Sequence, residues 1–151
     1  MIKKILVGLD GSHFAEQILA YTAELAAQLD SRVILLEVTI PPGAAVEPLT
    51  GYFRPTPMAK ILRQEDEAAA YLKQLAQKLR KTGLKVSTLT VPGDPGETIL
   101  RTAAEKKVDL IVLSTHGRSG LRRLVFGSVA EYVLKHSSLP ILLRKPEPTT
   151  G

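Results

Sequence analysis

The segment Val108–Ser114 reads VDLIVLS, and its four central residues form an unbroken apolar run. Such a run is typical of a strand that is covered on both faces, as in a parallel sheet. The segments Ile2–Leu9 and Arg32–Thr39 have the same character, being short, rich in Val, Ile and Leu, and bounded by turn residues. Leu84–Val91 and the shorter Pro140–Arg144 complete the set. The sequence therefore predicts five strands.

Helical patterns separate these strands. Apolar residues recur every three to four positions between residues 14 and 29 and within a long segment of about residues 57–82. Asp94–Glu97 and Ser128–Glu131 have the D-x-x-E and S-x-x-E spacing of capping boxes. Strands that alternate with helices predict one open, doubly wound five-stranded parallel sheet with helices on both faces, an α/β fold. The residues expected to face the core are Phe14, Ile18, Tyr21, Leu25 and Leu29 in the first helix and Leu62, Ala69, Leu72, Leu75 and Leu79 in the second.

Length and composition set the organisation of the chain. Its 151 residues predict a single domain over residues 1–146 and a flexible tail over residues 147–151. Cysteine is absent, which excludes disulfides and thiolate zinc sites. The apolar stretch after Lys3 and Lys4 stops at Asp10, too early for a signal peptide, and no run approaches the ~18 apolar residues of a membrane span. We therefore expect a cytoplasmic protein.

The basic charge is uneven along the sequence. The net charge is +5, but residues 1–115 carry 14 basic and 13 acidic side chains, whereas residues 116–145 carry six basic and one acidic. Aromatic residues are only 5% of the chain, and nucleic-acid surfaces interleave cations with aromatics. The basic segment therefore predicts a local field for a small polyphosphate, or a dimer surface, with no nucleic-acid and no membrane partner.

Two strand ends carry the polar and glycine-rich residues expected of a ligand site. The first predicted strand ends in Gly8–Ser12, and the fourth ends in Ser114–Gly120, before Gly127 and Ser128 open the last helix. Ligands of open α/β sheets bind outside the carboxyl ends of the strands, where the strand order reverses. A glycine-rich loop that leads into a helix N-terminus favours an anion, with phosphate as the first candidate.

The glycine-rich segments do not match the other common ligand-binding or catalytic motifs. There is no G-x-x-x-x-G-K-[ST] loop and no G-x-G-x-x-G after the first strand, so neither common phosphate motif is present. Gly117–Gly120 follows a strand, unlike the G-x-x-G loop that joins two helices in KH domains, and no G-x-S-x-G elbow exists. Two simpler roles stay open: Ser128 with Glu131 is sufficient as a helix cap, and Asp10 is sufficient as a turn acceptor. His116 is interpreted as a loop-packing residue, not a catalytic base.

The combined motifs resemble the universal stress protein family, and the resemblance covers essentially the whole chain. The nucleotide signature of that family is G-x2-G-x9-G-[ST], and Ser114 stands where the signature has its first glycine. The family implies an α/β sheet of five parallel strands that is Rossmann-like and adenine nucleotide α-hydrolase-like, usually dimeric, and ATP-binding in one subgroup. The matching segments are ILVGLDGS at 5–12, GDP at 93–95, VDLI at 108–111, HGR at 116–118, GS at 127–128 and LPILL at 139–143.

The resemblance also implies a binding site. The backbones around Gly117, Gly127 and Ser128, with the Ser128 hydroxyl, would hold the phosphates. Asp10 would face the ribose or a divalent metal carried by the nucleotide, and the backbone near Val38 would meet the adenine edge. The full set of expected nucleotide-binding residues is Asp10, Ser12, Val38, Ser114, His116, Gly117, Arg118, Gly127, Ser128 and Val129.

These features predict a nucleotide-binding switch or sensor of the stress response. The expected ligand is ATP or a related adenine nucleotide, with Mg or Mn, bound between the first and fourth strands. No residue is predicted to be catalytic, because no general base has a defined partner, and at most slow ATP hydrolysis is expected. The alternative is an interaction protein of the same fold that binds no nucleotide. We also expect a homodimer formed through the 140–144 strand.

Overall fold

The structure is a computed structural model of the whole chain. It describes all residues except 40–57, 116–126, 146 and 148–151, and it describes the side chains of 13, 14 and 58–63 no further than their place in helices. Five strands form one sheet in the order β3-β2-β1-β4-β5, and every neighbouring pair is parallel. The strands are β1 (Lys4–Leu9), β2 (Arg32–Thr39), β3 (Lys85–Pro92), β4 (Leu110–Ser114) and β5 (Ile141–Arg144), and the helices are α1 (His13–Glu16), α2 (Ile18–Leu29), α3 (Met58–Arg80), α4 (Pro95–Glu105) and α5 (Ser128–His136).

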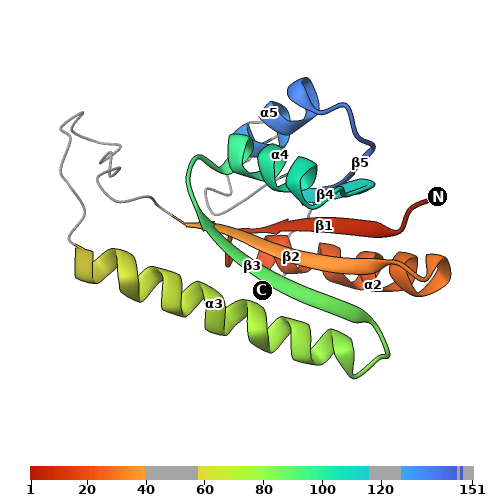
Figure 1. Ribbon diagram of the computed structural model, residues 1–151, viewed down its shortest axis with the longest axis horizontal. Coiled ribbons are helices and arrows are strands. Elements are labelled where there is room, and N and C mark those ends of the chain that lie inside the picture. The colour runs from red at the N-terminus through yellow and green to blue at the C-terminus, as the bar shows by residue number, and fades with distance from the viewer. Residues whose placement is uncertain (40–57, 116–126, 146, 148–151) are drawn as a thin grey trace.

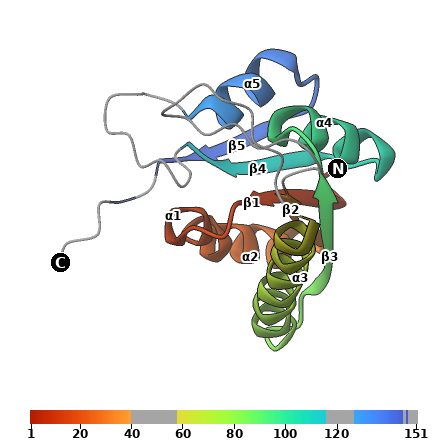
Figure 2. The ribbon, with the colours of Figure 1, turned by 90° about the vertical axis from the view of Figure 1, so that its left-hand side faces the viewer.

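The predicted doubly wound α/β fold is confirmed. Helices α1, α2 and α3 cover one face of the sheet, and α4 and α5 cover the other (Figures 1 and 2). Connections between parallel strands are right-handed. The face on which a connecting helix lies is therefore set by the direction in which the chain moves across the sheet from one strand to the next. The chain moves from β1 to β2 and β3, and then crosses back to β4 and β5. The order of the strands therefore fixes the layers.

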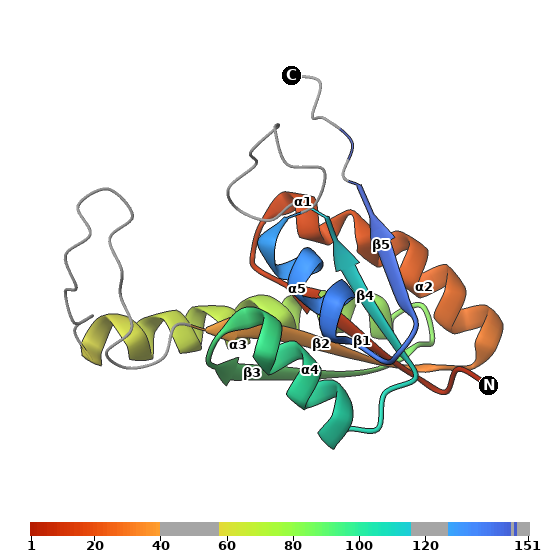
Figure 3. The same cartoon turned by 90° about the horizontal axis from the view of Figure 1, so that it is seen from above.

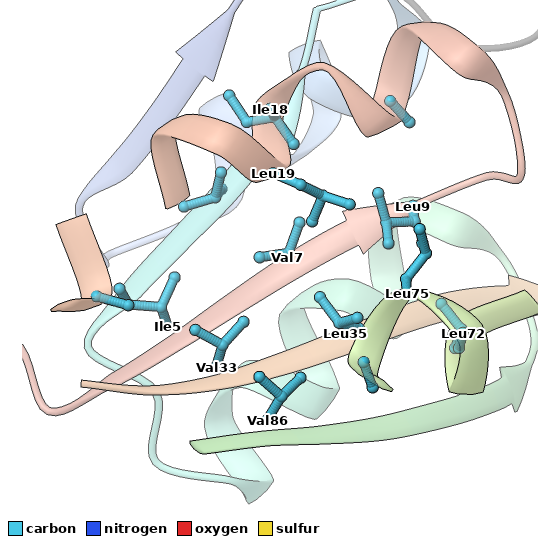
Figure 4. Close-up of a cluster of buried hydrophobic side chains, with 14 of the residues drawn as sticks. Ile5, Val7, Leu9, Ile18, Leu19, Val33, Leu35, Leu72, Leu75 and Val86 are labelled. Atoms are coloured by element: carbon cyan, nitrogen blue, oxygen red, sulfur yellow. The ribbon is translucent and has the colours of Figure 1, made fainter. Parts of the chain in front are cut away.

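Each face of the sheet has its own apolar core. Alternate side chains of a strand point to opposite faces, so Ile5 and Val7 enter the core under α2 and α3 while Leu6 enters the core under α4 and α5. Figure 4 shows the first core, in which Leu72 and Leu75 of α3 meet the strands. Ile5, Leu6 and Val7 are completely buried, as the continuous apolar run of a doubly covered strand predicts.

The fourth strand is shorter than predicted, because Asp109, just before it, binds the start of β1 with its side chain. β4 begins at Leu110, while Asp109 turns its carboxylate toward the start of β1. The backbone amides of Lys3 and Lys4 donate to Asp109 Oδ2 over 2.8 and 2.9 Å. These two bonds hold the pKa of Asp109 below its ordinary value, and desolvation opposes them in part. The carboxylate thus fixes the start of β1 against the turn that precedes β4.

The first predicted helix is wrong in two respects. It is divided at Gln17 into the single-turn α1 and the longer α2, and Tyr21, expected in the core, is 52% exposed. The buried residues of α2 are Ile18, Leu19, Thr22 and Ala26, a stripe displaced from the predicted one. The guanidinium of Arg144 in β5 lies 4.5 Å from the centre of the Tyr21 ring, so a largely buried cation covers this aromatic face. Similarly, Ala68 of α3 is buried and Ala69 is exposed.

The division into a domain over residues 1–146 and a flexible tail over residues 147–151 stays a prediction. Glu147, the first residue of the predicted tail, donates its backbone N–H to Gln17 Oε1 over 2.9 Å. The rest of that tail lies outside the described residues. Among the helices described, none combines the length and the apolar character needed to cross a bilayer.

Helices α4 and α5 approach closely at a glycine. A Cβ placed on Gly96, in the first turn of α4, would lie 2.5 Å from Tyr132 Cδ1 and 2.9 Å from Cγ. Gly96 therefore sets the distance between α4 and α5, and through it the position of the start of α5. We predict that Gly96→Ala lowers the free energy of unfolding by about 1–3 kcal/mol, although alanine is the better helix former. Equilibrium urea unfolding measures the change.

Tyr132 supplies the control for this prediction. In a Tyr132→Ala background the space beside Gly96 is empty, so Gly96→Ala should change stability by no more than about 0.5 kcal/mol. An equal loss in both backgrounds would show that the cost lies in the α4 backbone and not in the contact between the helices.

Candidate functional site

The sheet topology places a crevice between the carboxyl ends of β1 and β4. These strands are neighbours, but β1 leads into α1 on one face, whereas α5, which follows β4 in the fold, lies on the other (Figure 3). The two connections diverge and leave the edge between them open, as the rule for ligand sites in α/β sheets requires.

A cavity of about 320 Å³ occupies this crevice. Its inner wall is apolar and its mouth is polar, which is the usual composition of a small-molecule site. The apolar wall consists of Leu36 and Val38 of β2, Pro95 and Ile99 of α4, and Leu113 of β4. The polar mouth consists of Asp10, Ser114, Thr115, Gly127 and Ser128.

Six of the ten predicted site residues line this cavity. They come from four elements that are far apart in the sequence, which is the convergence expected of a functional site. They are Asp10, Val38, Ser114, Gly127, Ser128 and Val129. Ser12 instead caps α1, and its Oγ accepts the backbone N–H of Ala15 over 3.2 Å. The other three, His116, Gly117 and Arg118, lie outside the described residues.

Asp10 has a structural role at the mouth of the cavity. Its Oδ1 accepts the backbone N–H of Ser12 over 2.9 Å, and this turn leads directly into the Ser12 cap of α1. One of the two simpler roles, that of turn acceptor, is therefore confirmed for Asp10. The same bond fixes the carboxylate at the end of β1, beside the cavity.

Ser128 is not a helix cap, so the predicted S-x-x-E capping box is wrong. The N-cap of α5 is Gly127, in extended conformation, and Glu131 donates its backbone N–H to the Gly127 carbonyl over 2.9 Å. No hydrogen bond from a described side chain caps this helix, and Ser128 is its exposed first residue. The first backbone amides of a helix have no partner within it. The Ser128 hydroxyl and these amides therefore lie together at the cavity mouth.

Of the apolar wall, the sequence predicted Val38 and missed the other residues. Leu36, Ile99 and Leu113 read as ordinary core residues, and all three do belong to the core under α4 and α5. Strand alternation assigns Leu36 to the face opposite Leu35, but it does not say which face holds the cavity. Only the crossover from β3 back to β4 decides that, and with it the identity of the wall.

The carboxylates near Asp10 are organised around a tyrosine. The Tyr71 hydroxyl of α3 donates to Glu16 Oε1 over 2.7 Å. Burial, and after it the nearby charges of Glu16, Glu37 and Asp10, raises the pKa of Tyr71 well above its ordinary value. Within the part of the chain that the structure describes, no three His, Asp or Glu side chains are placed to hold a metal ion together.

A five-stranded parallel sheet with helices on both faces and a cavity at its switch point makes the chain a Rossmann-like α/β protein. The model of the universal stress protein family matches residues 1–145, and the chain belongs to that family. The resemblance given by the sequence motifs is thereby confirmed.

Individual relatives agree along the whole chain. The chain is 31% identical over 148 residues to universal stress protein MJ0531 of Methanocaldococcus jannaschii, covering 97% of this chain and 85% of that protein. It is 31% identical over 146 residues to universal stress protein YxiE of Bacillus subtilis, covering 95% and 99%. The solved structure of M. jannaschii MJ0577 superposes with a TM-score of 0.78 at 28% identity over 99% of both chains.

Two more distant structures share the fold. A universal stress protein solved in complex with cAMP superposes with a TM-score of 0.65 at 21% identity, covering 95% of this chain and 97% of that one. The Archaeoglobus fulgidus protein in complex with dAMP has a TM-score of 0.65 at 19% identity, covering 95% and 97%.

The caps of α4 and α5 make a matched pair for experiment. Asp94 caps α4 by accepting the Glu97 backbone N–H over 3.1 Å, whereas Ser128 accepts no such bond. We predict that Asp94→Ala lowers the free energy of unfolding by about 1 kcal/mol, while Ser128→Ala changes it by less than about 0.5 kcal/mol. Urea unfolding of both variants measures this, and an equal loss would restore the capping role of Ser128.

Proposed function

We propose that this protein binds an adenine nucleotide, with ATP as the first candidate, in the cavity between β1 and β4. The observation that carries the proposal is the junction, within one cavity, of an apolar slot and a helix N-terminus. Its volume of about 320 Å³ falls at the lower end of the range of small-molecule pockets. An adenine base needs an apolar slot and a phosphate needs unpaired N–H donors, so the two halves of the cavity match the two halves of the ligand.

Each end of the cavity has residues suited to its part of the ligand. The adenine would lie against Val38 and Leu36 at the end of β2, and the phosphates would approach Gly127 and Ser128. The dipole of α5 favours negative charge at that point, and glycine lets its backbone come close. Asp10 would face the ribose, or a Mg or Mn ion brought in with the phosphates.

The relatives support an adenine ligand. Two universal stress proteins of the same fold were solved with cAMP and with dAMP, both of which carry an adenine base and a phosphate. Ser114, at the position of the first glycine of the family signature, lines the cavity here. Its side chain narrows the space beside the phosphates compared with glycine.

The proposed role is that of a switch or sensor in the cytoplasmic stress response. Phosphoryl transfer needs a positioned metal, cationic clamps and a group that orients water. Among the described residues that line the cavity, Asp10 is the one ionisable side chain, and none of them is a cation. Binding that changes the state of the protein, with at most slow hydrolysis, fits this set of residues better than rapid turnover.

A thermal melt tests the binding. A ligand that binds only the native state stabilises it by RT ln(1 + [L]/Kd), about 2.7 kcal/mol at a hundredfold excess over Kd. We therefore expect millimolar Mg·ATP to raise the Tm by several degrees. No shift, together with no nucleotide released from the freshly purified and then denatured protein, would leave the alternative of an interaction protein that binds no nucleotide.

A pair of leucine variants tests the position of the phosphates. Gly127→Leu places a bulky side chain at the cavity mouth, whereas Ala70→Leu adds the same side chain at an exposed position of α3. The shift with Mg·ATP should disappear in the first variant and persist in the second. Persistence in both would place the phosphates elsewhere.

We also propose that two chains associate through the β5 edge of the sheet. β5 is an edge strand, and its residues Ile141, Leu142 and Leu143 are half-buried. An apolar edge strand is a template for pairing with another chain. A second β5, related by a two-fold axis, would cover it.

Exposed apolar side chains flank this edge on both faces. Tyr21 of α2 is 52% exposed and lies under Arg144 of β5. Leu134 of α5 is 48% exposed. The Tyr132 ring lies toward α4. Leu134 follows Tyr132 by two residues, a rotation of about 200° around the helix, so Leu134 points away from α4 and toward β5. Few large apolar side chains among the described residues are this exposed, and two of them lie at this edge.

Light scattering at micromolar concentration tests the association. We predict twice the chain mass for the natural sequence. Leu134→Glu should give the single mass, because pairing would bury an uncompensated charge. Ala70→Glu, which adds the same charge on the exposed side of α3, should leave the mass unchanged. A single mass for the natural sequence would contradict the proposed dimer.

A further inference from the structure

The amino ends of β1–β4 carry more positive charge than the near-neutral total of residues 1–115 suggests. We define the amino-end surface as the first residues of these strands, the turns before them, and the last turns of α2, α3 and α4, all at the end of the sheet beside the N-terminus (Figure 1). It holds nine cations and three carboxylates, an excess of six, and eight of the cations are exposed. The cations are Lys3, Lys4, Arg32, Lys78, Arg80, Lys81, Lys85, Lys106 and Lys107.

Backbone contacts hold these cations in one continuous surface. Arg32 pairs in register with Lys4 of β1 on one side and with Lys85 of β3 on the other. Lys4 Nζ donates to the Lys106 carbonyl over 2.9 Å, which joins β1 to the turn after α4. Neighbouring strands lie about 4.8 Å apart, so cations from four neighbouring elements are closely spaced. Arg80 is fixed there too, since its Nε and Nη2 donate to the Val86 carbonyl.

The carboxylates of this surface leave most of the charge uncompensated. Asp30 pairs with Lys85 over 3.2 Å, and Glu105 pairs with Arg101, outside the surface, at 3.9 Å. Asp109 is engaged by two backbone amides. Within the described part of the chain, ion pairs therefore reach one of the nine cations of the surface, Lys85.

The acids are concentrated at the other end of the sheet. Among the described side chains at the carboxyl ends of β1 and β2 and in the first turns of α1 and α4 are five carboxylates and no cation, whereas β5 ends in Arg144 and is followed by Lys145. The five carboxylates are Asp10, Glu16, Glu37, Asp94 and Glu97. Residues 1–115 are nearly neutral in total because the sum adds charges that the fold separates.

Helix dipoles account for only part of this arrangement. Cations in the last turn of a helix are stabilised by its negative end, and Lys78 and Arg80 of α3 are in that position. The last turns of α2 and α4 have no basic residue. Lys3, Lys4, Arg32 and Lys85 belong to strand starts, which have no comparable dipole. These cations need another explanation.

We propose that the amino-end surface binds the anionic phospholipid headgroups of a membrane, in contrast to the expectation from the sequence that there is no membrane partner. The cations extend in two dimensions, across the width of four strands and over the ends of α3 and α4, and seven of the nine are lysines. A lysine-rich face is attracted by the surface potential of an anionic membrane without specific contacts. Nucleic-acid sites instead combine a groove that follows the phosphate backbone with stacking aromatics, and no aromatic residue belongs to this surface.

Vesicle flotation tests this proposal with the full chain. We expect binding to phosphatidylcholine vesicles that contain about 30% phosphatidylserine, no binding to phosphatidylcholine alone, and release as salt rises beyond about 0.3 M. Each lysine near an anionic surface contributes about a fivefold increase in partitioning. The triple variant Lys3→Gln, Lys81→Gln, Lys106→Gln should therefore bind on the order of a hundredfold more weakly.

A second triple variant controls for net charge. Lys73→Gln, Arg101→Gln, Lys145→Gln removes the same charge from exposed positions outside the amino-end surface, and it should bind vesicles within about fivefold of the natural sequence. An equal loss in both variants would overturn the proposal, since only the total charge would then matter. Tighter binding to a single-stranded or duplex oligonucleotide than to vesicles at the same ionic strength would also overturn it, in favour of a nucleic-acid surface.

Discussion

The burial of β1 between two apolar layers is the constraint on which the rest of the molecule depends. Its residues Ile5, Leu6 and Val7 are completely buried, and they alternate between the two cores. Each such side chain contributes about 1.5–3 kcal/mol when it leaves water. Because β1 pairs with β2 on one side and with β4 on the other, the same strand also sets the position of the chain reversal. The Asp109 carboxylate accepts the backbone amides of Lys3 and Lys4 and so fixes the register of β1 against β4 at the amino end of the sheet.

Parallel pairing gives the molecule two chemically different ends. All strands finish at the same end of the sheet, where the connections diverge, the cavity opens and α5 begins. All strands start at the other end, where lysines gather in turns and strand starts. The proposed nucleotide site and the proposed membrane surface therefore occupy opposite ends of one sheet. Occupation of one end leaves the other accessible, and the rigid sheet between them is the shared element.

Sequence patterns predicted the structure correctly where both partners of an interaction lie close together in the sequence. The Asp94 cap is of this kind, because its acceptor and the Glu97 amide are three residues apart. Signals failed where a distant element competed. The S-x-x-E spacing at Ser128 predicted a cap, but the chain enters α5 through Gly127 and leaves that hydroxyl at the cavity. The periodicity of α2 placed Tyr21 in the core, but Arg144 from the far end of the chain covers its ring instead.

The five strands, the doubly wound sheet and polar residues of the cavity such as Asp10 and Ser114 could be predicted from the sequence. Apolar runs and strand ends are local properties, and ligands of such sheets bind at the switch point. The apolar side chains that form most of the wall, and the surface on which the charges gather, depend on how distant segments pack together. Lys4, Arg32, Lys85 and Lys106 are far apart in the sequence. Parallel pairing brings these cations to one end of the sheet and most of the acids of β1, β2, α1 and α4 to the other. Residues 1–115, which have almost no net charge, therefore fold with their positive and negative side chains separated.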